Sequence, residues 1–275
     1  MASLIGLLLA VGLRLTAGQL VESLRRCRLS YILLANFVGV PLIVVLLVQL
    51  FHLEAELALG MILLGAAPFA PVVPVFAKMV RADLALAAGL TSLIPFLSAF
   101  LSPIVCVCAI QVVSGAGNLR FNVLGILGTL LATITAPLLI GVAVNHLAPG
   151  FKRRVLRPVE IVSEATGALS LIVVTIIEFY SIVEIGWVPL LAMLISCELS
   201  LALGYFSGGS ERAVRRVVAL GTSNRNIALA LLLAIDSFAG TDVVPTVVAN
   251  GLLLILLGLL HVAFWRFNQD RKRGP

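Results

Sequence analysis

Successive apolar segments, each long enough to cross a bilayer, constrain the fold of this chain more than any other feature. Nine of them follow one another, and hydrophobic residues make up 61% of the 275 residues. Charged residues make up 12%, about half the share typical of soluble domains. A segment in lipid must satisfy its backbone internally, and these runs lack the short alternation of a β-barrel. The sequence therefore predicts an all-α polytopic membrane protein.

The nine predicted helices form one membrane domain over residues 1–275. We interpret the first as a retained span rather than a signal peptide, because no basic region precedes its apolar part. The predicted limits are 2–22, 29–51, 55–78, 83–113, 120–146, 157–179, 186–206, 212–238 and 241–267.

The Lys and Arg residues indicate how the predicted helices are oriented. Of the 19, 16 lie in alternate connections or at the C-terminal end, whereas the intervening connections contain only Arg120. Basic residues concentrate on the cytoplasmic side, so we expect an outside N-terminus and a cytoplasmic C-terminus in the inner (cytoplasmic) membrane of the cell. Contact with the anionic inner leaflet then explains the net charge of +6, and nucleic-acid binding is not expected.

The sequence contains no recognisable catalytic or metal-binding motif. It has no glycine-rich phosphate loop, no HExxH helix and no GxSxG elbow. The three His residues lack metal-ligand spacing, and three of the four Cys residues lie within predicted spans. We therefore expect neither an enzyme nor a resident metal or cofactor.

Two predicted spans contain residues that interrupt a helix. In the third, Pro68, Pro71 and Pro74 each remove a backbone donor and clash with the preceding turn, which predicts an unwound segment between two half-helices. The eighth contains the run GTSNRN, whose small polar residues and Gly221 favour a second break. Non-helical backbone at this depth survives only where protein buries it or a polar cavity hydrates it.

The two interrupted spans lie five positions apart in chain order and cross the membrane in opposite directions. This relation is typical of inverted-repeat transporters, in which discontinuous helices meet at the substrate site. The predicted repeats cover residues 1–113 and 120–268.

Two segments resemble the bile acid:sodium symporter family. One is GMILLGAAPFAPVVPVFAKMVRADLALAAGLTSLIPFLSAFLSP, which ends at Pro103, and the other is GTSNRNIALALLLA, which resembles the crossover helix of that family. The resemblance implies panel and core domains interleaved in sequence, two crossing broken helices, and alternating access by movement between the domains. It also implies that the chain begins at the second span of the ten-span form, so that its first repeat is one helix short.

The chain departs from that family at the sodium sites. The glutamate that closes the cation sites in sodium-coupled members corresponds to Ala219. Other family site positions carry Val73, Pro74, Ala87 and Ser223. Thr91 keeps an oxygen, as does Asn36, where relatives have Gln. Because a hard cation such as sodium needs about five or six oxygen ligands, these departures imply that the usual sodium coupling is lost.

Arg225 and Glu198 are the two charged residues that stand out within predicted spans. A guanidinium costs at least about 2.5–3.5 kcal/mol at a helix centre, so Arg225 should face a cavity and a counter-charge. It either replaces the missing cations, forms a bidentate pair with a substrate carboxylate, or forms a salt bridge without a transport role. Glu198 is its candidate partner, or a titrating group that couples transport to protons.

These features predict a secondary transporter of a small organic anion that works by alternating access without the usual sodium sites, either proton-coupled or as a uniporter. A sodium-coupled symporter with a rearranged site is one alternative, and a channel or a membrane receptor using the same pocket is another. The sequence does not indicate an oligomeric state. The candidate substrate-binding residues are Asn36, Thr91, Ser92, Thr222, Ser223, Asn224, Arg225 and Asn226.

Overall fold

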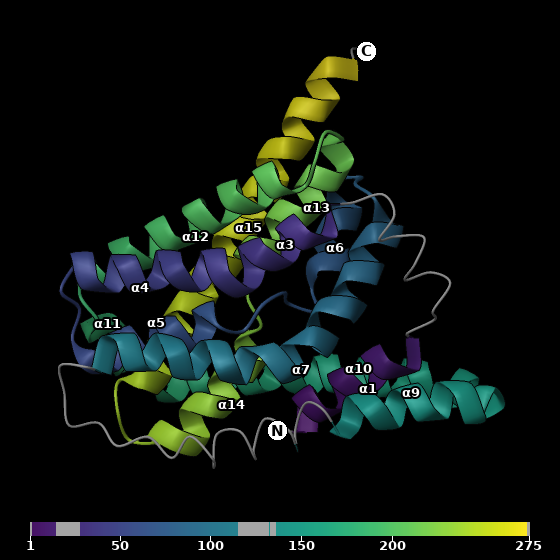
Figure 1. The fold of residues 1–275 in the computed structure, drawn as a ribbon, viewed down its shortest axis with the longest axis horizontal. Helices are drawn as coiled ribbons and strands as arrows, with labels where there is room; N and C mark the ends of the chain where they lie inside the picture. The colour runs from purple at the N-terminus through teal and green to yellow at the C-terminus, as the bar shows by residue number, and fades with distance from the viewer. Residues whose placement is uncertain (1, 15–27, 115–131, 133–135, 274–275) are drawn as a thin grey trace.

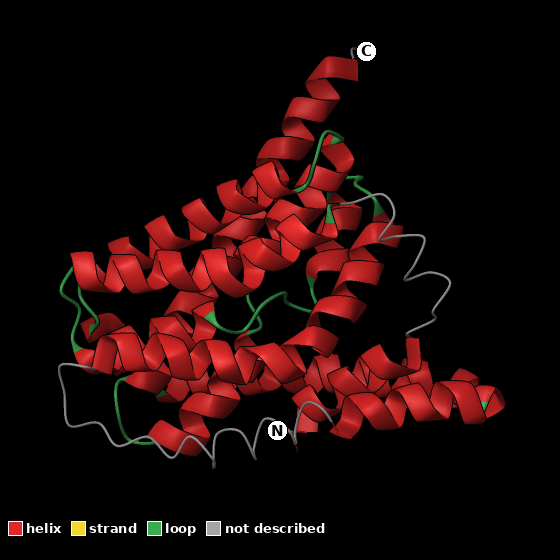
Figure 2. Ribbon diagram, in the orientation of Figure 1, coloured by secondary structure: helices red, strands yellow, loops and turns green. Residues whose placement is uncertain are grey.

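Helices account for the regular secondary structure of every part of the chain that the structure describes. The computed structural model describes residues 2–14, 28–114, 132 and 136–273, and no strand occurs in these ranges (Figure 1, Figure 2). The all-α prediction is therefore confirmed for the described residues. In chain order the helices are α1 (Ala2–Arg14), α3 (Leu29–Leu34), the π-helical turn η1 (Ala35–Gly39), α4 (Val40–Leu50), α5 (Ala55–Gly65), α6 (Val73–Met79), α7 (Leu84–Ser114), α9 (Ala136–Leu147), α10 (Pro149–Ile177), α11 (Phe179–Glu184), α12 (Trp187–Ser207), α13 (Arg212–Ser223), α14 (Ile227–Phe238) and α15 (Val243–Arg273).

Five stretches of described helix are long and apolar enough to cross a membrane, which supports a multi-pass membrane protein. A sixth candidate is α7, whose parts Leu84–Ser98 and Phe100–Ala109 meet at 46°. Pro103 favours a bend here, because proline has no N–H to donate to the carbonyl four residues earlier, that of residue 99. These six candidates correspond to the second, fourth and sixth to ninth predicted spans.

The other three predicted spans have different outcomes. The third is divided into the shorter helices α5 and α6. The first and fifth extend into residues 15–27 and 115–135, which lie almost wholly outside the described ranges. The total of nine membrane helices therefore stays a prediction.

The described helices form two groups in space. Helices α1, α9 and α10 pack mainly on one another and form a three-helix group, at the lower right of Figure 1. Gly12 of α1 and Gly141 of α9 allow this close packing, because a Cβ added to either glycine would lie 2.9 Å from the Cα of the other. The remaining described helices form the main bundle.

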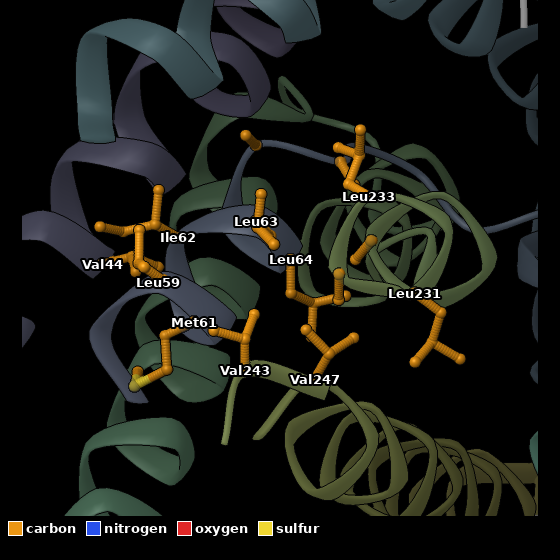
Figure 3. Close-up of a cluster of buried hydrophobic side chains, with 14 of the residues drawn as sticks. Val44, Leu59, Met61, Ile62, Leu63, Leu64, Leu231, Leu233, Val243 and Val247 are labelled. Atoms are coloured by element: carbon orange, nitrogen blue, oxygen red, sulfur yellow. The ribbon is translucent and has the colours of Figure 1, made fainter. Parts of the chain in front are cut away.

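Helix α5 lies at the centre of the main bundle. Its residues from Ala58 to Gly65 are all buried, and it packs against α4, α14 and α15. Figure 3 shows part of this core, a cluster of buried side chains that includes Leu59 and Leu64 of α5, Leu231 of α14 and Val247 of α15. A helix that is apolar all round is typical of a buried span. The carboxyl end of α5 is consequently enclosed by protein.

Candidate functional site

The breaks in the two interrupted spans lie against each other and share backbone hydrogen bonds. Helix α5 ends at Gly65 and α6 begins at Val73, while α13 ends at Ser223 and α14 begins at Ile227. The N–H of Ala70 donates to the carbonyl of Asn224 at 2.9 Å, and the N–H of Asn226 donates to that of Ala67 at 2.8 Å. Loop segments accordingly cross the interior of the bundle in Figure 2. Each break thus satisfies backbone groups that the other leaves open.

The break residues differ in part from those expected from the sequence. Pro68 and Pro71 lie in the first break, but Pro74 is in the first turn of α6, where a missing N–H costs little. Gly221 lies inside α13, and the second break begins at Asn224, which corrects the expectation that Gly221 forms it. Gly221 is instead the contact point for the Phe69 ring, because a Cβ there would lie 1.9 Å from that ring.

Arg225 lies in the second break with all five of its N–H donors directed at protein oxygens. The residue is only 3% exposed. Nη1 donates to Asn36 Oδ1 at 3.0 Å and to the Thr222 carbonyl at 3.5 Å. Nη2 donates to the carbonyls of Asn36, at 3.1 Å, and of Gly65, and Nε donates to the Leu64 carbonyl at 3.5 Å. Since a guanidinium has five N–H donors, Arg225 has none left for a ligand.

Asn36 offers its carbonyl to Arg225 because of a local change in helix register. In a regular α-helix this carbonyl would accept from the N–H of Val40, but within η1 Val40 donates to Ala35 instead. The π-helical donor for Asn36 would be residue 41, which is Pro41 and has no N–H. The carbonyl is therefore left without an intrahelical partner, and the guanidinium of Arg225 bonds it.

The other carbonyls around Arg225 belong to the ends of two helices. Leu64 and Gly65 form the last residues of α5, and Pro68 has no N–H for the Leu64 carbonyl. Thr222 is next to the last residue of α13. The carboxyl ends of helices carry partial negative charge, which favours a cation in this position. The guanidinium thus joins both helix ends to η1 without a carboxylate.

Glu198 does not contact Arg225, which corrects the expected pairing of these two residues. Its Oε2 lies 3.3 Å from Nε2 of His261, so the contact joins α12 to α15. Nδ1 of His261 lies 2.8 Å from the Leu257 carbonyl and must therefore carry a proton. The contact between Glu198 and His261 is an ion pair when the imidazole is protonated.

The small polar residues beside Arg225 also complete hydrogen bonds within the protein. Thr222 Oγ1 accepts from Nδ2 of Asn36 at 3.1 Å, and the Ser223 hydroxyl donates to the Leu220 carbonyl at 3.3 Å. Asn224 Nδ2 donates to that same carbonyl at 2.9 Å. Oδ1 of Asn226 accepts from the N–H of Leu229 and caps α14. These side chains therefore stabilise the crossing of the two breaks.

A polar cavity lies between the three-helix group and the main bundle. It holds about 60 Å³ of space open to water-sized molecules, roughly enough for four to six waters. Thr91 of α7 is 7% exposed and its Oγ1 has no hydrogen-bond partner in the described residues. Arg14 of α1 forms an ion pair with Glu160 of α10 at this cavity. The lining residues are Leu7, Ala10, Val11, Arg14, Pro71, Pro74, Ala88, Thr91, Glu160 and Glu164.

The predicted site residues are divided between this cavity and the crossing. Thr91 is the one predicted substrate-binding residue among the lining residues of the larger cavity. Ser223 and Arg225 line a second space of about 10 Å³, which holds about one water and also borders Ser196, Ser200 and Asn250. Asn36 is bonded to Arg225 and Thr222, and the side chain of Ser92 lies outside the described part of the chain.

Glu160 and Glu164 are not among the site residues predicted from the sequence. Both lie within the predicted span 157–179, one helical turn apart and therefore on one face of α10. Acidic residues within a membrane span are a functional signal by themselves. Their closeness to the basic segment that ends at Arg157 makes them resemble residues of the membrane interface. No group of three or more His, Cys, Asp or Glu side chains suited to a metal occurs in the described residues.

Comparison with known proteins identifies the family. The sodium bile acid symporter family model matches residues 1–185, which include the first break and the residues lining the larger cavity. The match ends before α12 and the second break. No curated protein is matched by this sequence. Because the family model covers about two thirds of the 275 residues, the chain belongs to the sodium bile acid symporter family of membrane transporters.

Proposed function

We propose that this protein is a secondary transporter that carries a small metabolite by alternating access without using a bound sodium ion. The observation that carries the proposal is a polar cavity lined by both helix groups, next to the crossing of two broken helices. A cargo bound between two helix groups changes its contacts when the groups move relative to each other, so its binding is coupled to that movement. The three-helix group corresponds to the panel of the family, and the main bundle to its core.

Arg225 performs the structural task of a bound cation in this proposal. Five oxygens surround its guanidinium, two from Asn36 and three from the ends of α5 and α13. Five or six oxygens are about what a sodium ion needs to replace its water shell. A cation that is part of the chain neither binds nor leaves during the cycle. The crossing is therefore held together at every sodium concentration.

We further infer that the chain has nine spans arranged as inverted repeats over 1–113 and 120–268, in the inner membrane, with an outside N-terminus. The opposite directions of the two breaks and the distribution of basic residues support this arrangement.

Glu198 and His261 provide a candidate site for proton coupling. A protonated imidazole keeps the pair neutral overall, which suits a span, and proton loss would leave an unpaired carboxylate. With such coupling, an inward proton gradient drives uptake by the wild type, and Glu198→Gln transports cargo without responding to the gradient. An equal gradient response in Glu198→Gln assigns the pair a packing role.

Counterflow in sodium-free proteoliposomes tests the transport proposal. We expect a radiolabelled ligand that stabilises the purified protein to enter vesicles preloaded with the same unlabelled compound, with saturation and trans-stimulation. These properties require a binding site that reorients with its cargo. Flux that does not saturate would indicate a channel, and binding without flux would indicate a receptor; either result contradicts the proposal.

A further inference from the structure

The charges around the larger cavity do not suit an anionic cargo. Arg225, the basis for expecting a carboxylate substrate, has all five donors bonded to protein oxygens and is absent from the cavity lining. The lining contains one basic residue, Arg14, and two acidic residues, Glu160 and Glu164. The described lining therefore has a formal charge of −1 when all three groups are ionised.

The ion pair at this cavity leaves Glu164 as the uncompensated charge. Arg14 Nε contacts Glu160 Oε1, which joins α1 to α10. The Glu160 side chain is 17% exposed and that of Arg14 is 52% exposed, so the acidic partner is the more enclosed of the two. Glu164 lies one turn further along α10, is exposed, and has no ion-pair or hydrogen-bond partner among the described residues. A carboxylate at the boundary of two helix groups attracts a cation.

Thr91 supplies an independent sign that a polar ligand occupies this cavity. Its hydroxyl is buried without a hydrogen-bond partner, which costs about 1–3 kcal/mol unless a ligand or water completes the bond. Thr91 belongs to the main bundle, whereas Glu164 belongs to the three-helix group. A ligand that reaches both residues therefore contacts both moving bodies.

We propose that the cargo is a small molecule with a protonated amine, whose ammonium group pairs with Glu164 and bonds the Thr91 hydroxyl. This inference rests on the proposed transport function and specifies the substrate class for its cavity. An ammonium group donates three hydrogen bonds, which suits a carboxylate and a hydroxyl oxygen. The apolar residues Leu7, Ala10 and Val11 on α1 fit a short hydrocarbon part.

Thermal unfolding of the purified full chain with matched small ions tests this assignment. The probes are n-alkylammonium ions from ethyl to hexyl, the alkanoate ions of the same lengths, and the corresponding neutral alcohols. We expect only the ammonium series to raise the melting temperature of the wild type. Glu164→Gln should weaken ammonium binding at least about tenfold, because it removes a charge-assisted hydrogen bond.

Two further variants separate binding from folding. Thr91→Val keeps the shape of the side chain and should weaken ammonium binding while leaving the ligand-free protein at least as stable. Glu184→Gln on α11 is the matched control, since Glu184 is exposed and outside the cavity lining, and it should bind as the wild type does.

The possible results distinguish this inference from the transport proposal. Stabilisation by alkanoates, by sodium alone or by neither ion series would overturn the amine assignment, as would an unchanged ammonium affinity in Glu164→Gln. Saturable counterflow of a non-amine cargo would leave the transport proposal standing in each of these cases. Ammonium binding without counterflow would contradict transport and retain the binding site.

Discussion

Replacement of Arg225 by alanine is expected to destabilise the protein by at least about 3 kcal/mol and to abolish transport. The substitution removes the guanidinium from five oxygens, of which the Leu64 carbonyl keeps the N–H of Ala67 as a donor. Each buried group left unsatisfied costs about 1–3 kcal/mol. Partial relaxation and entry of water reduce the sum. The loss falls where two helix ends and η1 meet, so the geometry of the crossing changes as well. Chemical unfolding of the purified variant in detergent, together with counterflow in vesicles, measures both effects.

Two other substitutions test whether the loss in Arg225→Ala is caused by the guanidinium at this position. Arg225→Lys keeps the charge but provides only three donors on a compact head, so it should recover a minor part of the lost stability. Arg212→Ala removes an exposed arginine at the start of the same span and should change stability by less than about 0.5 kcal/mol. Wild-type stability and transport in Arg225→Ala would show that the guanidinium does not hold the crossing.

Substitution of Gly221 by alanine is expected to have the second-largest effect, a loss of about 2–3 kcal/mol together with most of the transport activity. A Cβ at this position would lie 1.9–2.4 Å from three atoms of the Phe69 ring. Phe69 is fully buried between the two halves of the third span and has a φ of 58°. The ring cannot move aside without moving the first break, so the added methyl group separates the crossing segments. Melting temperature and counterflow report the result.

A double variant tests whether the Phe69 contact is the cause. Phe69→Leu combined with Gly221→Ala should lose less stability than the sum of the two single variants, because the smaller side chain leaves room for the methyl group. Gly150→Ala is the matched control, since no atom lies within 4 Å of a Cβ added there. Additive losses would exclude the ring contact as the source of the effect.

The sequence predicted the helix breaks well because their causes are local. Pro68 and Pro71 remove donors from the third span, and Asn224 and Asn226 are poor helix formers. Asn224 bonds the end of α13, and Asn226 caps the start of α14. The prediction that Gly221 breaks the helix was wrong, because a glycine in a helix can also serve close packing, which helix propensity does not reveal. Its role depends on Phe69, which is far away in the sequence.

The partners of the charged residues could not be predicted from the sequence, since they depend on distant contacts. The oxygens around Arg225 come from Asn36, Leu64 and Gly65 as well as from nearby Thr222. The five-residue spacing of Asn36 and Pro41 indicates a free carbonyl only in a π-helical register, which the structure shows. The pairing of Glu198 with His261 likewise joins two helices that are not adjacent in sequence.

The charged residues that line the cavity could not be identified from the sequence, because their positions depend on tertiary structure. The expectation of an anionic cargo assumed that the guanidinium of Arg225 faces the substrate. Its donors are instead used within the main bundle, while Glu160 and Glu164 line the boundary with the three-helix group. The described lining of this cavity therefore contains more acidic than basic residues, whereas the sequence drew attention to a basic one.

The melting temperature of the purified wild-type protein in sodium chloride and in potassium chloride of equal concentration tests most directly whether Arg225 takes the place of a bound cation. A ligand that binds only the folded state raises the melting temperature, so a functional sodium site would make the two salts differ. With the guanidinium already bonded to five oxygens, the melting temperature should be the same in both salts. A rise specific to sodium would contradict the replacement of sodium by Arg225.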